Sequence, residues 1–367
     1  MIRQAYRYAL RPTAVQRRAL AGHCGCARFA WNWGLARVKA ALDAGEEVPS
    51  GYDLGKVWTQ EKPAWAGEYS RRVVEGALRA LDQAVKDWRS GKRIRGVPVG
   101  LPRFKARGRC RRSCTFCGQT LRIEGRAVVL PRIGRVALHE APRVKGRIGS
   151  ATVSWGGKRW FVSLQVERDR QPPGPRPGPA VGVDLGLRAF ATLSTGEQVH
   201  APTPLATALR RLRRLQRAAA RCQPGSANQA KVQRLVARLH ARVADVRRDF
   251  LAKLSTRLAK SFSAVVIEDL DVAALLGEAR PLARRLADAG WGEFRRMLEY
   301  KCGWYGARLV VAPRGFPSTN TCSACGALRP RPLGTSTHTF RCATCGHAAD
   351  RDVNAAQNLE RLAHGAP

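Results

Sequence analysis

Apolar residues in the first half of the chain follow two different periods. After an alternating stretch at residues 1–10, Thr13 and Gln16 have the spacing of a helix-capping box, and apolar residues then recur at helical intervals. Between Leu121 and Val166 apolar and polar residues alternate instead, which is the period of half-buried strands. This order predicts a small, twisted β-barrel or sheet that is interrupted by helices.

The second half begins after a segment that neither a helix nor a central strand tolerates. Residues 171–179 are rich in Pro and Gly and predict a semi-rigid linker. Apolar runs at 180–187 and 264–267 then predict buried strands. The basic segment from 204 to about 260, broken near 224–226, predicts a helical hairpin. Strands that alternate with helices indicate an α/β domain.

Lysine and arginine far outnumber the acidic residues. The chain of 367 residues has 65 Lys and Arg against 27 Asp and Glu, a net charge of +38, while its apolar content of 44% is that of a globular protein. Such an excess indicates a polyanionic partner, for which nucleic acid is the first candidate. No apolar run reaches 18 residues and the N-terminus lacks the apolar stretch of a signal peptide. We therefore expect a cytoplasmic protein with no membrane partner.

Four cysteines near the C-terminus have the spacing of a metal site. Cys322 and Cys325 form one CxxC pair, Cys342 and Cys345 form a second, and a glycine follows each pair. Two such pairs in a protein of a reducing compartment are typical of a tetrahedral, structural zinc site. Because four thiolates complete the coordination shell, we expect this site to hold structure and to take no part in chemistry.

Three acidic residues lie at the ends of elements that should be buried. Asp184 ends the run Val-Gly-Val-Asp, Glu268 follows the run Ala-Val-Val-Ile, and Asp352 opens the final helix. Converging carboxylates can hold two Mg²⁺ ions about 3.5–4 Å apart for phosphodiester hydrolysis. Each acid alone has a structural alternative, as a turn former, a strand end or a helix cap. Three acidic neighbours are alternative ligands: Asp269, Asp271 and Asp350.

The acidic motifs and the paired cysteines, in this order, resemble the TnpB family, whose members are transposon-encoded, RNA-guided nucleases related to the compact type V CRISPR effectors. The resemblance covers nearly the whole chain, because further motifs are similar to the family: Trp31-Asn32-Trp33, Pro102-Arg103-Phe104-Lys105, Trp291-Gly292-Glu293-Phe294, Trp304-Tyr305-Gly306 and Phe316-Pro317-Ser318. It implies an RNA-guided, Mg²⁺-dependent endodeoxyribonuclease that cuts double-stranded target DNA beside a short flanking motif, with guide RNA and target DNA as partners.

The resemblance also implies roles for the candidate residues. Asp184, Glu268 and Asp352 would be the ligands of two catalytic Mg²⁺ ions, with Mn²⁺ as an alternative, in a RuvC-type, RNase H-like domain. The four cysteines would hold one structural Zn²⁺. The implied domain order is a wedge β-barrel at 1–170 with a helical recognition insert at about 11–117, a linker at 171–179, a RuvC-like nuclease at 180–315, a zinc ribbon at 316–347 and the last part of the nuclease at 348–367.

Two basic clusters are the candidate contacts to nucleic acid. The first follows the Pro-Arg-Phe-Lys motif, and a solvated loop is its structural alternative: Arg103, Lys105, Arg107, Arg109, Arg111 and Arg112. The second crowds one predicted helix, where like charges repel unless a polyanion binds: Arg210, Arg211, Arg213 and Arg214. A lone CxxC at Cys114 and Cys117, with Cys110 nearby, is a weak metal signal and departs from the family's pattern.

Two other classes of function remain as alternatives. The first is an RNA-guided DNA binder or regulator that does not cut, which a missing acid would favour. All three acids are present in this chain. The second is a transposase that transfers DNA strands with the same acidic fold. The long basic N-terminal half suits guide binding better than strand transfer.

Overall fold

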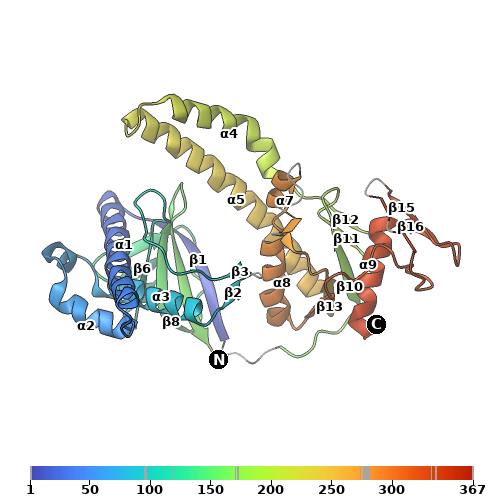
Figure 1. The fold of residues 1–367 in the computed structure, drawn as a ribbon, viewed down its shortest axis with the longest axis horizontal. Coiled ribbons are helices and arrows are strands. Elements are labelled where there is room, and N and C mark those ends of the chain that lie inside the picture. The colour runs from blue at the N-terminus through green and yellow to red at the C-terminus, as the bar shows by residue number, and fades with distance from the viewer. Residues whose placement is uncertain are drawn as a thin grey trace. The chain divides into compact units, whose positions relative to one another are not determined.

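The computed structural model describes two compact units, Met1–Arg170 and Gln171–Pro367, which we treat separately (Figure 1). The boundary lies at the start of the segment rich in Pro and Gly. The structure describes residues 2–94, 97–118, 120–169, 171, 173–272, 274–275, 282–331, 333–334 and 337–365. Among these residues, no helix is long and apolar enough to cross a membrane.

The first unit is a sheet covered by helices. Its elements are β1 (Ile2–Arg11), α1 (Ala14–Asp43), α2 (Gly51–Glu61), η1 (Ala64–Glu68), α3 (Arg71–Arg89), β2 (Arg93–Ile94), β3 (Val97–Pro98), β4 (Ser113–Cys117), β5 (Arg122–Glu124), β6 (Ala127–Leu130), β7 (Gly134–Leu138), β8 (Arg147–Trp155) and β9 (Trp160–Arg168). The predicted capping box begins α1, because the Thr13 side chain accepts from the Gln16 amide and the Gln16 side chain accepts from the Thr13 amide.

The expected closed barrel is not found among the described residues. Seven strands form one sheet in the order β4-β8-β9-β1-β7-β6-β5, and no strand pairing joins its two edges, β4 and β5. The sheet bends because β1 changes partner along its length. Ala9 still pairs with β9, whereas Leu10 and Arg11 pair with β7. Helix α3 packs closely on the edge, since a Cβ at Gly76 would lie 2.4 Å from the Thr115 carbonyl oxygen.

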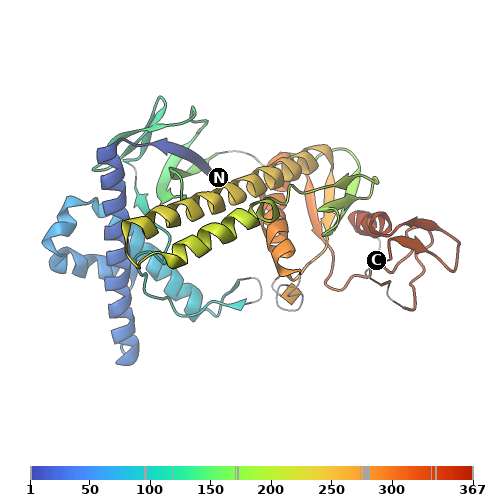
Figure 2. The ribbon, with the colours of Figure 1, turned by 90° about the horizontal axis from the view of Figure 1, so that it is seen from above.

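The second unit is a mixed sheet between helices. Its elements are β10 (Ala180–Leu185), β11 (Ala191–Leu193), β12 (Gln198–Val199), α4 (Pro204–Arg221), α5 (Ala227–Ser261), β13 (Ala264–Ile267), α7 (Ala283–Ala289), α8 (Trp291–Tyr305), β14 (Arg308–Val311), β15 (Thr339–Arg341), β16 (Ala348–Asp350), α9 (Arg351–Arg361) and η2 (Leu362–His364). The five-stranded sheet has the order β12-β11-β10-β13-β14, with β10, β13 and β14 parallel. The predicted helical hairpin is confirmed: α4 and α5 run side by side in Figure 1 and Figure 2.

The two faces of the second sheet are covered by different helices. Residues of odd number in β10 and β13, such as Val183 and Val265, pack in one core with α5 and α8. Residues of even number, such as Ala264 and Val266, pack on the other face with Leu359 of α9. Because side chains alternate along a strand, this division also decides which face the acidic residues at the strand ends share.

Candidate functional site

Strand register places Asp184 and Glu268 next to each other. In the parallel pairing of β10 with β13, Val183 lies opposite Ile267, and the next residues along the two strands are Asp184 and Glu268. Both numbers are even, so both side chains belong to the face that α9 covers. The carboxyl ends of adjacent parallel strands thus bring together two acids that are far apart in sequence.

Helix α9 brings the third acid to the same place. A Cβ at Gly182 would lie 1.8 Å from the Ala356 carbonyl oxygen, so the backbones of β10 and α9 touch there. From this contact, Asp184 lies two residues further along the strand, about 7 Å away. Asp352 lies four residues back along the helix, about 6 Å away. Asp184 and Asp352 therefore lie at similar distances from the contact between Gly182 and Ala356, and their charges interact.

Burial raises the pKa of two of these carboxyl groups, those of Asp184 and Glu268. The pKa of Asp184 is raised well above its usual value, first by burial and then by the charges of Glu268 and Asp352, while the Arg351 guanidinium opposes the shift. Burial also raises the pKa of Glu268, against the effect of a hydrogen bond from Ser318. Buried like charges of this kind favour a bound cation, and carboxylate oxygens are the donors that Mg²⁺ prefers. The donor set therefore fits a hard divalent metal.

Two side chains bind the acids directly. The Ser318 hydroxyl donates to Oε1 of Glu268 at 2.5 Å. The Arg351 guanidinium contacts Oδ1 of Asp352 through Nε at 3.1 Å and Nη2 at 3.0 Å. These partners hold two of the three carboxylates in defined orientations. Within the described residues, the three acids do not bring an oxygen each within 4.8 Å of one another.

The alternative acidic ligands are engaged elsewhere. Asp269 pairs with Arg295, and Asp271 pairs with Arg314 at 3.4 Å. Asp350 is the N-cap of α9 and accepts from the first amides of that helix at 3.0 and 3.2 Å. Each of these acids thus has a local partner, although the charge of Asp350 also contributes to the raised pKa of Asp184.

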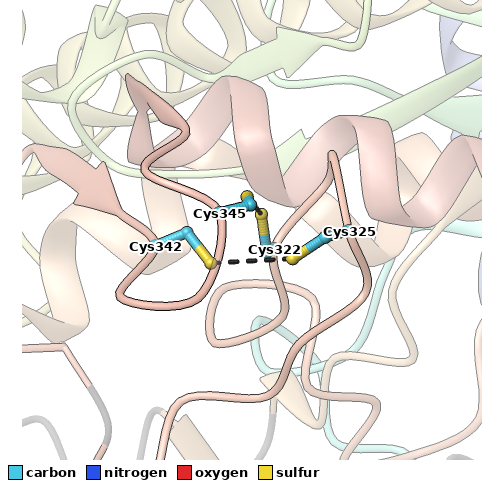
Figure 3. A group of neighbouring side chains, drawn as sticks. All are labelled: Cys322, Cys325, Cys342 and Cys345. Carbon is cyan, nitrogen blue, oxygen red and sulfur yellow. Dashed lines mark hydrogen bonds between the residues drawn. The ribbon is translucent and has the colours of Figure 1, made fainter.

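The four cysteine sulfurs form a compact group (Figure 3). Each lies within 4.8 Å of the other three, with 3.7 Å between Cys322 and Cys345 and 3.6 Å between Cys325 and Cys342. Four sulfurs arranged as a tetrahedron about 2.3 Å from a zinc ion would be separated by about 3.8 Å. All four cysteines are free thiols. The geometry fits one tetrahedral zinc ion, as the spacing predicts.

The two cysteine turns have the same backbone geometry. The Cys322 amide donates to the Ala327 carbonyl and the Cys342 amide to the His347 carbonyl, both at 2.9 Å. The glycine after each CxxC pair has a positive φ, 78° in one turn and 74° in the other, which a larger side chain resists. Backbone amides of the second turn, first that of Cys345, lower the pKa of the Cys342 thiol to about 6. Amides of this kind stabilise the thiolate that binds metal.

The first basic cluster lies in a loop held by α1. The Trp31 indole donates to the Arg103 carbonyl at 3.1 Å, and the Asn32 side chain bonds the Lys105 backbone at 2.8 and 3.1 Å. The Lys105 ammonium lies 3.3 Å from the centre of the Trp31 ring. Basic side chains of this loop line a cavity of about 930 Å³, together with Arg28: Lys105, Arg107, Arg111 and Arg112. Arg103 and Arg109 are exposed.

The second basic cluster lies on the helical hairpin. Arg210, Arg211, Arg213 and Arg214 are exposed on α4, on either side of the buried Leu212. Residues 204–244 contain no Asp or Glu, and ten of them are Lys or Arg. Within the described part of the chain, none of these ten has an ion-pair partner: Arg210, Arg211, Arg213, Arg214, Arg217, Arg221, Lys231, Arg234, Arg238 and Arg242.

The lone CxxC is buried in the first unit. Cys114 and Cys117 are buried in β4, and burial raises the pKa of the Cys117 thiol. Cys114 contacts Cys24 of α1 inside the hydrophobic core. Among the described residues, neither belongs to a group of three metal-ligating side chains. A β-strand does not supply the tight turn that a cysteine knuckle needs.

The sequence analysis missed four residues of this region: Ser318, Arg351, Asn354 and Asn358. Both asparagines are buried in α9, with 0% and 2% of their surfaces exposed, and they lie four residues apart on one face. Buried amides at helical spacing on an otherwise apolar face are a signal that could have been noticed. Ser318 lies in the Phe-Pro-Ser motif but has no chemical signal of its own.

Comparison with known proteins supports one family along the whole chain. Family models match at residues 163–278 (OrfB_IS605, "Probable transposase"), 291–359 ("Cas12f1-like, TNB domain") and 1–47 (HTH_OrfB_IS605, "Helix-turn-helix domain"). A solved Cas12f1–sgRNA–target DNA complex is similar in fold, with a TM-score of 0.59, 12% identity and 98% of each chain covered.

Two relatives share the sequence over nearly its full length. A protein of Mycobacterium tuberculosis H37Rv is 38% identical over 399 residues, covering 98% of this chain and 86% of its own. InsQ of Escherichia coli K12 is 30% identical over 382 residues, covering 98% and 92%. Both are named "Putative RNA-guided DNA endonuclease". By these similarities, the chain belongs to the TnpB (OrfB/IS605) family.

Proposed function

We propose that this chain is an RNA-guided, metal-dependent DNA endonuclease whose Asp184, Glu268 and Asp352 hold two Mg²⁺ ions. The observation that carries the proposal is the register that sets Asp184 beside Glu268, with Asp352 near enough for its charge to act on Asp184. The pKa of Asp184 is raised first by burial and then by the charges of Glu268 and Asp352. Structural roles alone do not explain why a chain so poor in acids would place three of them, each only partly exposed, so near one another. The strand order and the helix across it support a RuvC-type, RNase H-like domain.

The acids and the side chains that contact them would have different roles in phosphodiester hydrolysis. When bound, a pair of Mg²⁺ ions would supply the Lewis acidity that activates water and stabilises the leaving oxygen. The charges of both other acids act on Asp184, whose pKa is raised first by burial, so Asp184 would hold metal together with Glu268 and Asp352. Ser318 orients Glu268, and Arg351 orients Asp352 while adding positive charge beside the acids.

The basic surfaces are the proposed contacts to guide RNA and target DNA. The cavity beside α1 offers cations from one loop and from Arg28, and the α4–α5 hairpin offers ten cations without ion-pair partners in the described chain. Phosphate neutralisation of this kind carries no sequence information. We propose that guide pairing reads the target and that the first unit, as wedge and recognition insert, contacts a short flanking motif. The four cysteines would hold one structural Zn²⁺.

The proposal is tested by RNA that co-purifies with the protein. We expect expression with the native flanking DNA to yield one dominant RNA, with a constant scaffold and a variable end. The purified complex should then cut a supercoiled plasmid that carries the matching target, and Asp184→Ala should bind the RNA but leave the plasmid intact. A heterogeneous RNA pool would contradict RNA guidance, joined rather than cut DNA would indicate a transposase, and cleavage by Asp184→Ala would contradict the metal site.

A further inference from the structure

One loop of the second unit connects the cysteine cluster to an acidic residue. Ser318 lies in the segment that leads into Cys322, and 2% of its surface is exposed. Its hydroxyl donates to Oε1 of Glu268 at 2.5 Å, across 50 residues of sequence. An ionised carboxylate only accepts hydrogen bonds, so the serine must be the donor. Among the described residues, it is the hydrogen-bond donor that the structure gives to Glu268.

The same loop is fixed to the helix that carries the third acid. The Asn358 side-chain amide donates to the Ser318 carbonyl at 2.8 Å and to the Thr321 carbonyl at 2.6 Å. Asn354 donates to the Thr321 carbonyl at 2.8 Å, and its own carbonyl accepts from the Ser323 amide at 2.8 Å. One buried face of α9 thus holds both the serine that contacts Glu268 and the residues on either side of Cys322.

We propose that the cysteine ribbon positions Glu268 for metal binding through Ser318. The inference rests on the proposed function, since it assigns Glu268 to a metal. Thr321 and Ser323, on either side of Cys322, are bound by the same asparagines that hold Ser318, so loss of zinc from the turn would disturb the contacts that fix this loop to α9. The sheet itself would remain folded, because Phe316 is the one described residue of the ribbon that packs against its two cores. Ser318 is therefore a positioning residue, and the ribbon acts on the acidic site without contacting a substrate.

The test measures metal binding apart from cleavage. Mn²⁺ is titrated into full-length, zinc-loaded, guide-free protein and free Mn²⁺ is followed by electron paramagnetic resonance. Because partners of metal ligands typically contribute 10- to 100-fold in affinity, we expect Ser318→Ala to weaken Mn²⁺ binding by about 10-fold or more, and Ser318→Thr to restore it. In the guided complex, the Mg²⁺ concentration for half-maximal cleavage should rise by the same factor. Ser263→Ala is the control, because it removes one hydroxyl hydrogen bond, to Pro179, at the other end of β13.

Measuring Mn²⁺ affinity after zinc removal distinguishes a positioning role of Ser318 from a merely structural one. If zinc acts through Ser318, then in protein dialysed free of zinc the Ser318→Ala substitution should cost no further Mn²⁺ affinity, since coupled effects do not add. Additive losses would overturn the inference, as would an unchanged Mn²⁺ affinity in a Ser318→Ala protein that keeps its zinc. If that variant loses zinc on purification, Ser318→Cys, with a side chain of similar size and a weaker donor, serves in its place.

Glu268→Gln separates this inference from the proposed function. If Glu268→Gln keeps both Mn²⁺ binding and guided cleavage, the proposed metal site is wrong. If Glu268→Gln loses both while Ser318→Ala loses neither, the metal site stands and only the positioning role is wrong.

Discussion

The four cysteines of the ribbon lie within 24 residues of sequence, whereas the three acids are spread over 169 residues. Each cysteine pair sits on its own backbone turn, and the two turns repeat the same hydrogen bonds. The acids depend instead on strand register and on one helix that is packed against Gly182. The cysteine site can therefore be recognised from the spacing of its residues in the sequence. The acidic site is assembled by the fold, so substitutions of residues that are not themselves ligands can disrupt it.

The two sites also differ in their electrostatics. Amides of the second cysteine turn lower the pKa of Cys342 and so favour the ligand form. Burial and repulsion raise the pKa of Asp184 and disfavour its ligand form. At Cys345 the His347 amide lowers the pKa, but hydrogen bonds from the other thiols of the cluster raise it to about 12. The local hydrogen bonds therefore favour the ligand form at Cys342 and not at Cys345, while the acidic site holds charge that a cation would relieve.

The largest expected effect comes from a substitution of Asp184 in the acidic site. Asp184→Asn should lower guided cleavage by about 1,000-fold or more, because a catalytic metal contributes several kcal/mol to the transition state. The affinity for guide RNA should not change. Rate constants from single-turnover cleavage of a plasmid, with RNA binding measured in parallel, check this, and rates near wild type would contradict the assignment.

The next largest effect comes from a substitution that displaces Asp352 without removing any of the three acids. Gly182→Ala forces α9 away from β10, and a displacement of about 1 Å at an active site can cost about 100-fold in rate. The overlap should also lower the free energy of unfolding by about 1–3 kcal/mol. Gly303→Ala is the matched control: an added Cβ in α8 would meet nothing within 4 Å, and we expect a gain of about 0.5–1 kcal/mol. Urea denaturation and cleavage assays distinguish the two.

Breaking the local site should cost less. Cys325→Ser removes one of four zinc ligands, and we expect cleavage to fall by about 10-fold through loss of positioning at Glu268. Zinc content, measured by a colorimetric chelator assay, should fall in the same protein. A variant that loses its zinc and cuts at the wild-type rate would show that the two sites are independent.

The basic hairpin should affect binding without affecting the acids. Replacing Arg210, Arg211, Arg213 and Arg214 by Gln should reduce the slope of log Kd against log salt for nucleic acid by about 3, since each phosphate contact contributes about 0.7–0.9. The control replaces four cations outside the hairpin that already have acidic partners: Arg71, Lys86, Lys92 and Arg122. An equal change of slope in both variants would mean that net charge, rather than the hairpin, sets the affinity.

The smallest effect concerns stability and pH in metal-free buffer. The pKa of Asp184 is raised in the folded chain, so the folded state binds the proton more tightly than the unfolded state does. Its contribution to stability is present below the unfolded pKa and is lost as pH rises through the folded pKa. Asp184→Asn should therefore be more stable than wild type at neutral pH, with the difference shrinking towards pH 4. Unfolding midpoints at several pH values measure this, and a pH-independent difference would contradict the buried charge.

Much of the fold could be predicted from periodicity, and the errors have physical causes. The helical hairpin and the capping box at Thr13 followed from local patterns. The prediction of a closed barrel was wrong. Strand β1 changes its pairing partner at Leu10, and the alternating pattern of the sequence does not encode such tertiary pairing. Ser318 and Arg351 were missed since each acts on an acid through geometry that only the folded chain provides.

The order of the three acids along the chain has a consequence for synthesis. Asp184 and Glu268 leave the ribosome first, and the helix that places Asp352 against β10 follows them. The basic surfaces of the first unit and of the α4–α5 hairpin also emerge before that helix. On the proposed function, a nascent chain can gather RNA before it can cut DNA.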